Sequence, residues 1–96
     1  MTTKEKALRL EARANETSAE LSAIDYAIYL VDEKRKSAAD MVQNVPQNIY
    51  IEDWKRELNH NADKLRHLER IKAELQIKLR HICKEWEKAE NELVKQ

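Results

Sequence analysis

The chain contains no glycine and only one proline, Pro46, which stands near the middle of its 96 residues. Glycine supplies the positive backbone angles that tight turns and helix C-caps commonly use, so a chain without it has few ways to fold into a domain of many turns. Proline, in contrast, interrupts the interior of a helix. These two facts predict an all-α protein in which two long helices meet close to Pro46.

Apolar residues recur at heptad spacing in both halves of the chain, at two positions that we call the seam. In the first half the seam residues are Ala7, Leu10, Ala14, Thr17, Leu21, Ile24, Ile28, Val31, Arg35, Ala38, Val42 and Val45. In the second half they are Ile51, Trp54, Leu58, Asn61, Leu65, Leu68, Lys72, Leu75, Leu79, Ile82, Trp86, Ala89, Leu93 and Gln96. Residues that alternate by three and four lie on one helix face, so this pattern is typical of coiled-coil pairing.

The pattern predicts an antiparallel, coiled-coil-like two-helix hairpin in one helical domain, 1–96. We expect a first helix over about 3–44, a turn over about 45–49 and a second helix over about 50–95. Facing seam residues then have numbers that add up to about 96. In this register Arg35 faces Asn61, and two polar residues that share a layer fix the register at some cost in stability.

The residues beside the seam fit the same register. Lys6 faces Glu92, Arg13 faces Glu85, Glu20 faces Lys78, Ala27 faces Ile71, and Lys34 faces Lys64 as the one like-charged pair. Residues 14–33 also hold five acidic residues and no Lys or Arg, whereas residues 64–84 hold seven basic residues and two acidic ones. The hairpin places these blocks side by side, so the basic segment is expected to be mainly an intramolecular complement.

Local signals mark the ends of the helices and two places where they could break. Thr2 followed by Glu5 is a capping box, and Asn48 stands where the second helix should be capped. Residues 17–20 form a second capping-box pattern, and residues 59–63 are rich in poor helix formers. The alternative fold is therefore a three- or four-helix bundle with breaks near 15–18 and 59–61.

The first helix is apolar on more than the face that the hairpin needs. The extra apolar residues are Ala19, Ala23, Tyr26, Tyr29 and Leu30, and the turn adds Ile49 and Tyr50. Exposed contiguous apolar surface usually marks association, and tyrosines are good interface anchors. We therefore predict a protein-binding module that docks on a larger partner, as an adaptor, a chaperone or a phage-type inhibitor of a host factor. The same surface could instead form a homodimer, which would make a four-helix bundle.

A second hypothesis is nucleic-acid binding by a basic stripe on the second helix. Arg66, Arg70, Arg80 and Lys84 follow helical spacing on an outward face and could track phosphates or an acidic partner. Two features weigh against this reading. The formal net charge of the whole chain is zero, and no aromatic residues lie within the stripe to stack on bases.

The remaining chemistry-bearing residues point to no metal or cofactor. His60, His67 and His81 occupy equivalent outward positions, and Asp63 with His67 has the spacing of half a metal site, but no further ligand converges on them. Cys83 is the only cysteine, so no internal disulfide is available and a reducing, cytoplasmic location is expected. Residues 1–6 lack the pattern of a secretory signal, and no apolar stretch is long enough to span a membrane.

One stretch of the first half is similar to a family of enzymes. Residues 21–25, followed by Arg35 and later by Pro46, resemble the first helix of the small all-helical chorismate mutases. That family binds a dicarboxylate with several cationic side chains, and only Arg35 matches one of them here. Ser18 stands where the family has an arginine. We therefore expect no catalytic activity.

Overall fold

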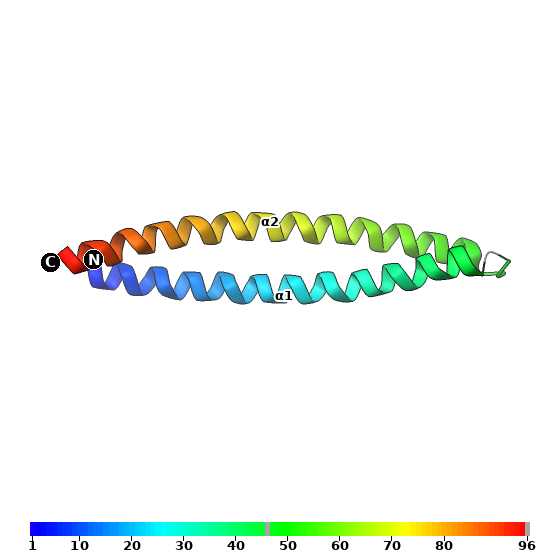
Figure 1. Cartoon of the computed structure of the whole chain (residues 1–96), viewed down its shortest axis with the longest axis horizontal. Coiled ribbons are helices and arrows are strands. Elements are labelled where there is room, and N and C mark those ends of the chain that lie inside the picture. Colours follow the sequence, from blue (N-terminus) through cyan, green and yellow to red (C-terminus); the bar gives the residue numbers. More distant parts are fainter. Residues whose placement is uncertain (46, 96) are drawn as a thin grey trace. The chain divides into compact units, whose positions relative to one another are not determined.

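The computed structural model describes residues 1–45 and 47–95, so Pro46, at which the sequence places the fold-back, and Gln96 lie outside the described residues. Helix α1 spans Thr3–Asn44 and helix α2 spans Ile51–Lys95. The two helices pack against each other as an all-α helical hairpin, which confirms the predicted fold class (Figure 1). Within the described residues no strand is present.

Both helices run without a break through the places where the sequence suggested one. The alternative fold with breaks near 15–18 and 59–61 is therefore wrong. Thr17 does not begin a new helix, because its Oγ1 donates a hydrogen bond to the carbonyl oxygen of Arg13 (2.9 Å), one turn earlier in α1. Asn61 is buried at the seam and donates to the Glu57 carboxylate (3.4 Å). In both cases the polar group is satisfied inside a continuous helix.

A side chain caps the start of α1, and an asparagine turn precedes the start of α2. The backbone N–H of Glu5 donates to Thr2 Oγ1 (3.2 Å), so Thr2 caps α1 as predicted. Before α2, Asn48 Oδ1 accepts the N–H of Tyr50 (2.7 Å), and the carbonyl oxygen of Asn48 accepts the N–H of Ile51 (3.0 Å). An asparagine turn of this kind requires no positive φ. Accordingly, no described residue has one.

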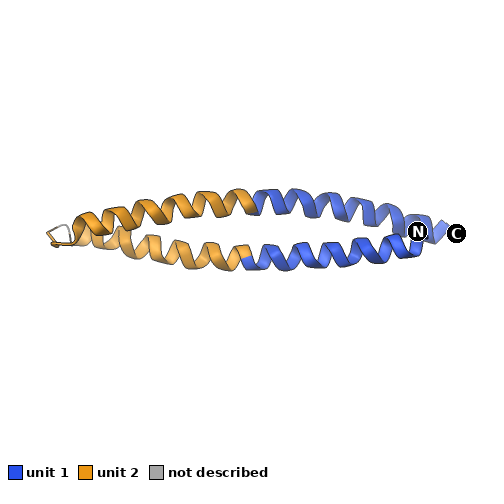
Figure 2. Cartoon of the chain, turned by 180° about the vertical axis from the view of Figure 1, so that it is seen from behind, with its two compact units in different colours: residues 1–23, 72–96 blue, residues 24–71 orange. Residues whose placement is uncertain are grey.

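The chain divides into two compact units, which are described separately below (Figure 2). Unit 1 consists of residues 1–23 and 72–96, and unit 2 of residues 24–71. Each unit thus contains one segment of α1 and one segment of α2, and each is two helices thick.

Unit 1 has a closed apolar core at the seam. Ala7, Leu10, Ala14, Ile82 and Ala89 are buried and form one cluster, and Leu79, Trp86 and Leu93 pack against it half-buried. The predicted register places Ala7 opposite Ala89 and Ala14 opposite Ile82, and the membership of this cluster agrees with it. Alanine is small enough for two helices to approach closely, which allows the larger leucine and isoleucine side chains to be covered.

Unit 2 has the same heptad repeat but a less buried seam. Only Ala38 and Asn61 are buried among the residues of this unit that the structure describes. Its larger apolar seam side chains remain half-buried, apart from Val45, which is exposed. The half-buried ones are Ile24, Ile28, Val31, Val42, Ile51, Trp54, Leu58, Leu65 and Leu68. Two facing helices therefore do not enclose the large side chains of this unit.

Candidate protein-binding surfaces

The tyrosine surface, which we define as Tyr26, Tyr29 and Leu30, lies on the α1 segment of unit 2. The exposed fractions of these residues are 64%, 59% and 43%. Tyr29 and Leu30 follow Tyr26 by three and four residues, so all three lie on the side of α1 away from the seam. Each tyrosine has a large ring to bury and a hydroxyl group that can donate or accept a hydrogen bond. The surface can therefore form an amphipathic contact with another protein.

The other predicted interface residues are also exposed. Ala19 and Ala23 belong to the α1 segment of unit 1. Ile49 and Tyr50 lie in the turn before α2, within unit 2, where the backbone of Tyr50 is held by its hydrogen bond to Asn48. Large apolar side chains that face water contribute no burial energy to the fold, but they can gain it by packing against another protein. Ile49 and Tyr50 therefore form a second apolar patch suited to a partner.

The basic residues of the nucleic-acid hypothesis are divided between the units. Arg66 and Arg70 are exposed in unit 2, and Arg80 and Lys84 are exposed in unit 1. Arg66 forms an ion pair with Asp63 of its own helix. An arginine that already has a carboxylate partner has less to gain from a phosphate, and nothing in the geometry favours this hypothesis over protein binding.

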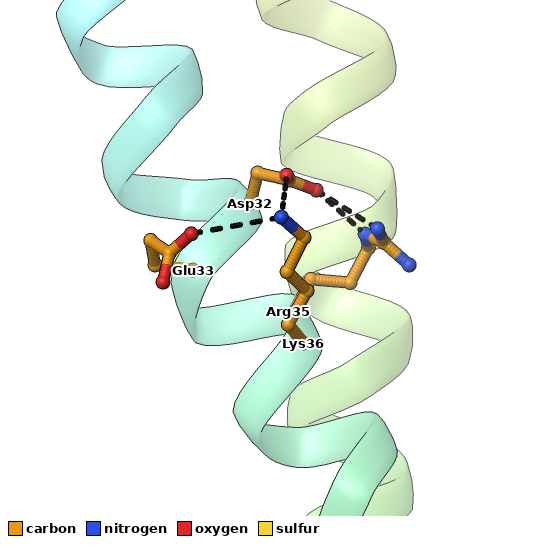
Figure 3. A network of polar contacts seen from close by, with 4 residues as sticks. All are labelled: Asp32, Glu33, Arg35 and Lys36. Atoms are coloured by element: carbon orange, nitrogen blue, oxygen red, sulfur yellow. Dashed lines mark hydrogen bonds and ion pairs between the residues drawn. The ribbon is translucent and has the colours of Figure 1, made fainter.

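Four charged residues of α1 form a cluster that includes the seam residue Arg35 (Figure 3). The other three are Asp32, Glu33 and Lys36. Arg35 donates from Nε and NH2 to Asp32 Oδ1 (3.1 and 2.8 Å), and Lys36 Nζ lies 3.2 Å from Asp32 Oδ2 and 3.6 Å from Glu33 Oε1. The hydrogen bonds from Arg35 and then Lys36 hold the pKa of Asp32 below its ordinary value. The hydrogen bond to Asp32 raises the pKa of Lys36.

The pairing of Arg35 with Asp32 bears on the polar layer predicted across the hairpin. Arg35 is half-buried and Asn61 is buried. Arg35 donates to Asp32 and Asn61 donates to Glu57, so each finds an acceptor on its own helix. A register-setting layer shared by Arg35 and Asn61 stays a prediction. The pairing across the hairpin does not reveal these local acceptors, although Asp32 lies three residues before Arg35 and Glu57 four residues before Asn61.

Two tryptophans line shallow surface hollows that sequence reasoning did not identify. In unit 2, Tyr50, Asp53, Trp54 and Glu57 line one hollow, and Trp54 and Glu57 line another together with Glu33, Lys34 and Ser37 of α1. In unit 1, Cys83 and Trp86 line a hollow with Glu87, Glu90 and Asn91. The indole N–H of Trp86 donates to Glu90 (3.0 Å). Both tryptophans occupy seam positions and are half-buried, so part of each ring is open to a hollow.

Neither a metal centre nor a membrane span is found in the described part of the chain. No group of three or more His, Cys, Asp or Glu residues there could hold a metal ion. Cys83 is a free, half-buried thiol. Among the described residues, neither helix contains a stretch long and apolar enough to cross a bilayer.

Comparison with known proteins identifies no relative. The chain matches no protein-family model, and it has no significant match among the curated proteins or the solved structures.

Proposed function

We propose that the chain is a non-enzymatic protein-interaction module that docks on a partner protein through the tyrosine surface. The observation that carries this proposal is the exposure of Tyr26, Tyr29 and Leu30 together on one helix segment of unit 2. Tyrosine is enriched among the residues that dominate binding energy at protein interfaces, because it buries a large rigid area at a low cost in conformational entropy.

The partner surface that fits is an apolar groove or helix face with hydrogen-bonding groups at its rim. The tyrosine rings and Leu30 would enter the apolar part, and the two hydroxyl groups would pair at the rim. The turn residues Ile49 and Tyr50 offer a further apolar contact in the same unit.

The proposal is tested by capturing partners with the full-length chain as bait in an extract of the cells that make it. We expect the double variant Tyr26→Asp, Tyr29→Asp to lose the captured partner, because it places two carboxylates where rings should be buried. The matched control is Asn15→Asp, Gln43→Asp, which adds the same charge at two exposed positions of α1. Circular dichroism checks that both variants keep the helicity of the parent.

Two results would contradict the proposal. One is a double variant that still captures the same partner with undiminished yield. The other is a control that loses the partner as completely as the tyrosine variant, because the effect would then come from added charge and not from the tyrosine surface.

A further inference from the structure

We propose that a second copy of the chain packs on unit 2 and completes a four-helix bundle there. The contact is an apolar edge made by both helices, which we call the edge surface. It consists of Ile24, Ala27 and Val31 on α1 and Leu68 and Ile71 on α2, all half-buried. This surface lies on a different side of α1 from Tyr26 and Tyr29, so the proposal goes beyond the function proposed above.

The first observation is the width of the apolar face, which differs between the units. The position next to the seam is exposed and charged throughout the described part of unit 1, where it is occupied by Lys6, Arg13, Glu20, Lys78, Glu85 and Glu92. In unit 2 the same heptad position is mixed. It holds Lys34, Tyr50, Glu57 and Lys64, which are exposed, but also Ala27, Met41 and Ile71, which are apolar and half-buried. An apolar seam alone suits a two-stranded coiled coil, whereas a seam widened by one flanking position suits a helix in a bundle.

The second observation is that unit 2 does not bury its own large side chains. Leu10 and Ile82 are buried in unit 1, although its other large apolar seam residues are half-buried, whereas no large apolar seam residue described in unit 2 is buried. Each half-exposed leucine or isoleucine forgoes part of the roughly 1.5–3 kcal/mol that full burial would contribute. A further pair of helices on the edge surface would cover Ile24, Val31 and Leu68.

The third observation is the total exposed area. The chain exposes 7292 Å², whereas a compact monomer of 11.4 kDa is expected to expose roughly 5,800 Å². The excess of roughly 1,500 Å² is more than the roughly 800 Å² per partner that a standard protein interface buries. Each copy therefore has enough surplus surface for a stable dimer interface.

The composition of the edge surface indicates that the occupant is a second copy. The edge has one apolar strip from each helix, so a two-fold axis perpendicular to the helices can place each strip of one copy on the same strip of the other, with the two copies antiparallel. The chain has no net charge, so two copies do not repel each other as a whole. Lys34 and Lys64, both exposed, lie toward the turn from the strips. An antiparallel arrangement of the two copies keeps the lysines of one copy away from those of the other.

The experiment measures the mass of the full chain by sedimentation equilibrium and native mass spectrometry at micromolar concentration. We expect the parent to have twice the mass of 11.4 kDa and the variant Ala27→Glu, Ile71→Glu to have the mass of one chain. The matched control is Ala12→Glu, Ile77→Glu, which makes the same two changes at exposed outward positions and should stay dimeric. Circular dichroism checks that both variants remain helical.

If the double Glu variant fails to fold, the milder variant Ile71→Ala decides the question. Alanine is the best helix former, so this change keeps the helix, and we expect it to weaken dimerisation by about tenfold. A parent chain with the mass of a monomer overturns the proposal. So does an Ile71→Ala variant whose dimerisation constant equals that of the parent.

The outcome is separable from that of the proposed function. A monomeric parent that still loses its captured partner through Tyr26→Asp, Tyr29→Asp overturns the dimer and leaves partner binding supported. A dimer that is abolished by the tyrosine variant and unaffected by the edge variants also overturns the edge surface, and assigns self-association to the tyrosine surface.

Discussion

Units 1 and 2 contain segments of the same two helices and follow the same heptad repeat, yet they bury their seams to different extents. Unit 1 has alanine at three of its buried seam positions, and its cluster encloses Leu10 and Ile82. Unit 2 has larger side chains at most seam positions, and of its described residues only Ala38 and Asn61 are buried. The comparison teaches that heptad spacing sets which residues face each other, whereas side-chain size sets how completely two helices alone can cover them.

The largest expected effect concerns the buried cores. Ile82→Ala should lower the free energy of unfolding by about 3 kcal/mol, because it empties a site that is 3% exposed. Leu68→Ala, at a half-buried position of unit 2, should cost about half as much in a monomer. Urea unfolding measures both values, and Ile77→Ala, at a site that is 50% exposed, serves as a control with a change of less than about 0.5 kcal/mol.

Equal losses for Ile82→Ala and Leu68→Ala in a monomeric sample would refute the difference between the two units. If the loss of stability in Leu68→Ala grows with protein concentration, the difference between the units becomes sharper. Binding of a second copy stabilises the folded state by mass action, and the variant would lose that contribution.

The next effect concerns the buried polar residue of each unit. Asn61 is 1% exposed, and its amide makes a long hydrogen bond to Glu57 (3.4 Å). Asn61→Leu should therefore raise the free energy of unfolding by about 1 kcal/mol, because a leucine has no amide to desolvate. Thr17 is also 1% exposed, but its hydroxyl donates at 2.9 Å. Thr17→Val should change stability by less than about 0.5 kcal/mol.

Thermal and urea unfolding of the two single variants check this prediction. A loss of stability in Asn61→Leu would show that the amide makes a net favourable contribution at the seam, and would support the predicted role of Asn61 in setting the register.

The smallest effect is the pH dependence of the charged cluster in unit 2, since its members are half-buried or exposed and ion pairs near the surface contribute little. The folded pKa of Asp32 is lowered by hydrogen bonds from Arg35 and Lys36. Its contribution to stability is thus present above the pKa of the unfolded chain and is lost as pH falls through the folded pKa. The folded pKa of Lys36 is raised. Its contribution to stability is therefore fully present below the pKa of the unfolded chain and is lost as pH rises through the folded pKa.

An NMR titration of the Asp32 carboxyl group measures the shift directly. We expect the pKa of Asp32 to rise toward the ordinary aspartate value in the variant Arg35→Gln, Lys36→Gln. An unchanged Asp32 titration in that variant would mean that the two cations do not hold the carboxylate in solution.

Much of the fold follows from residues that act locally. The seam spacing predicts the helical hairpin, and Thr2 predicts its own cap, because both signals depend on neighbours within one or two helical turns. The breaks near Thr17 and Asn61, which the alternative fold required, are absent because a local signal can be outweighed by packing against the other helix. Helix propensity disfavours these residues, but burial at the seam and a hydrogen bond within the helix outweigh a difference of tenths of a kcal/mol.

The details of the candidate surfaces were harder to predict from the sequence than the fold. Tyr26, Tyr29 and Leu30 were expected to be exposed, and they are. The hollows at Trp54 and Trp86 were not expected, since a hollow depends on how far a ring extends past the facing helix. The hydrogen bonds from Arg35 to Asp32 could not be predicted from the sequence. Several acceptors lie within reach of an arginine side chain, and only the packed geometry selects one.

By itself, the sequence determined that two long helices pair through one seam, because periodicity is a property of a single chain segment and needs no knowledge of its surroundings. Only the tertiary structure decided that the seam is closed at Ala7, Leu10 and Ile82 and half-open at Ile28 and Leu68. The physical reason is that burial depends on the volumes of the side chains that meet from both helices, and that sum is known only when the two helices are placed together.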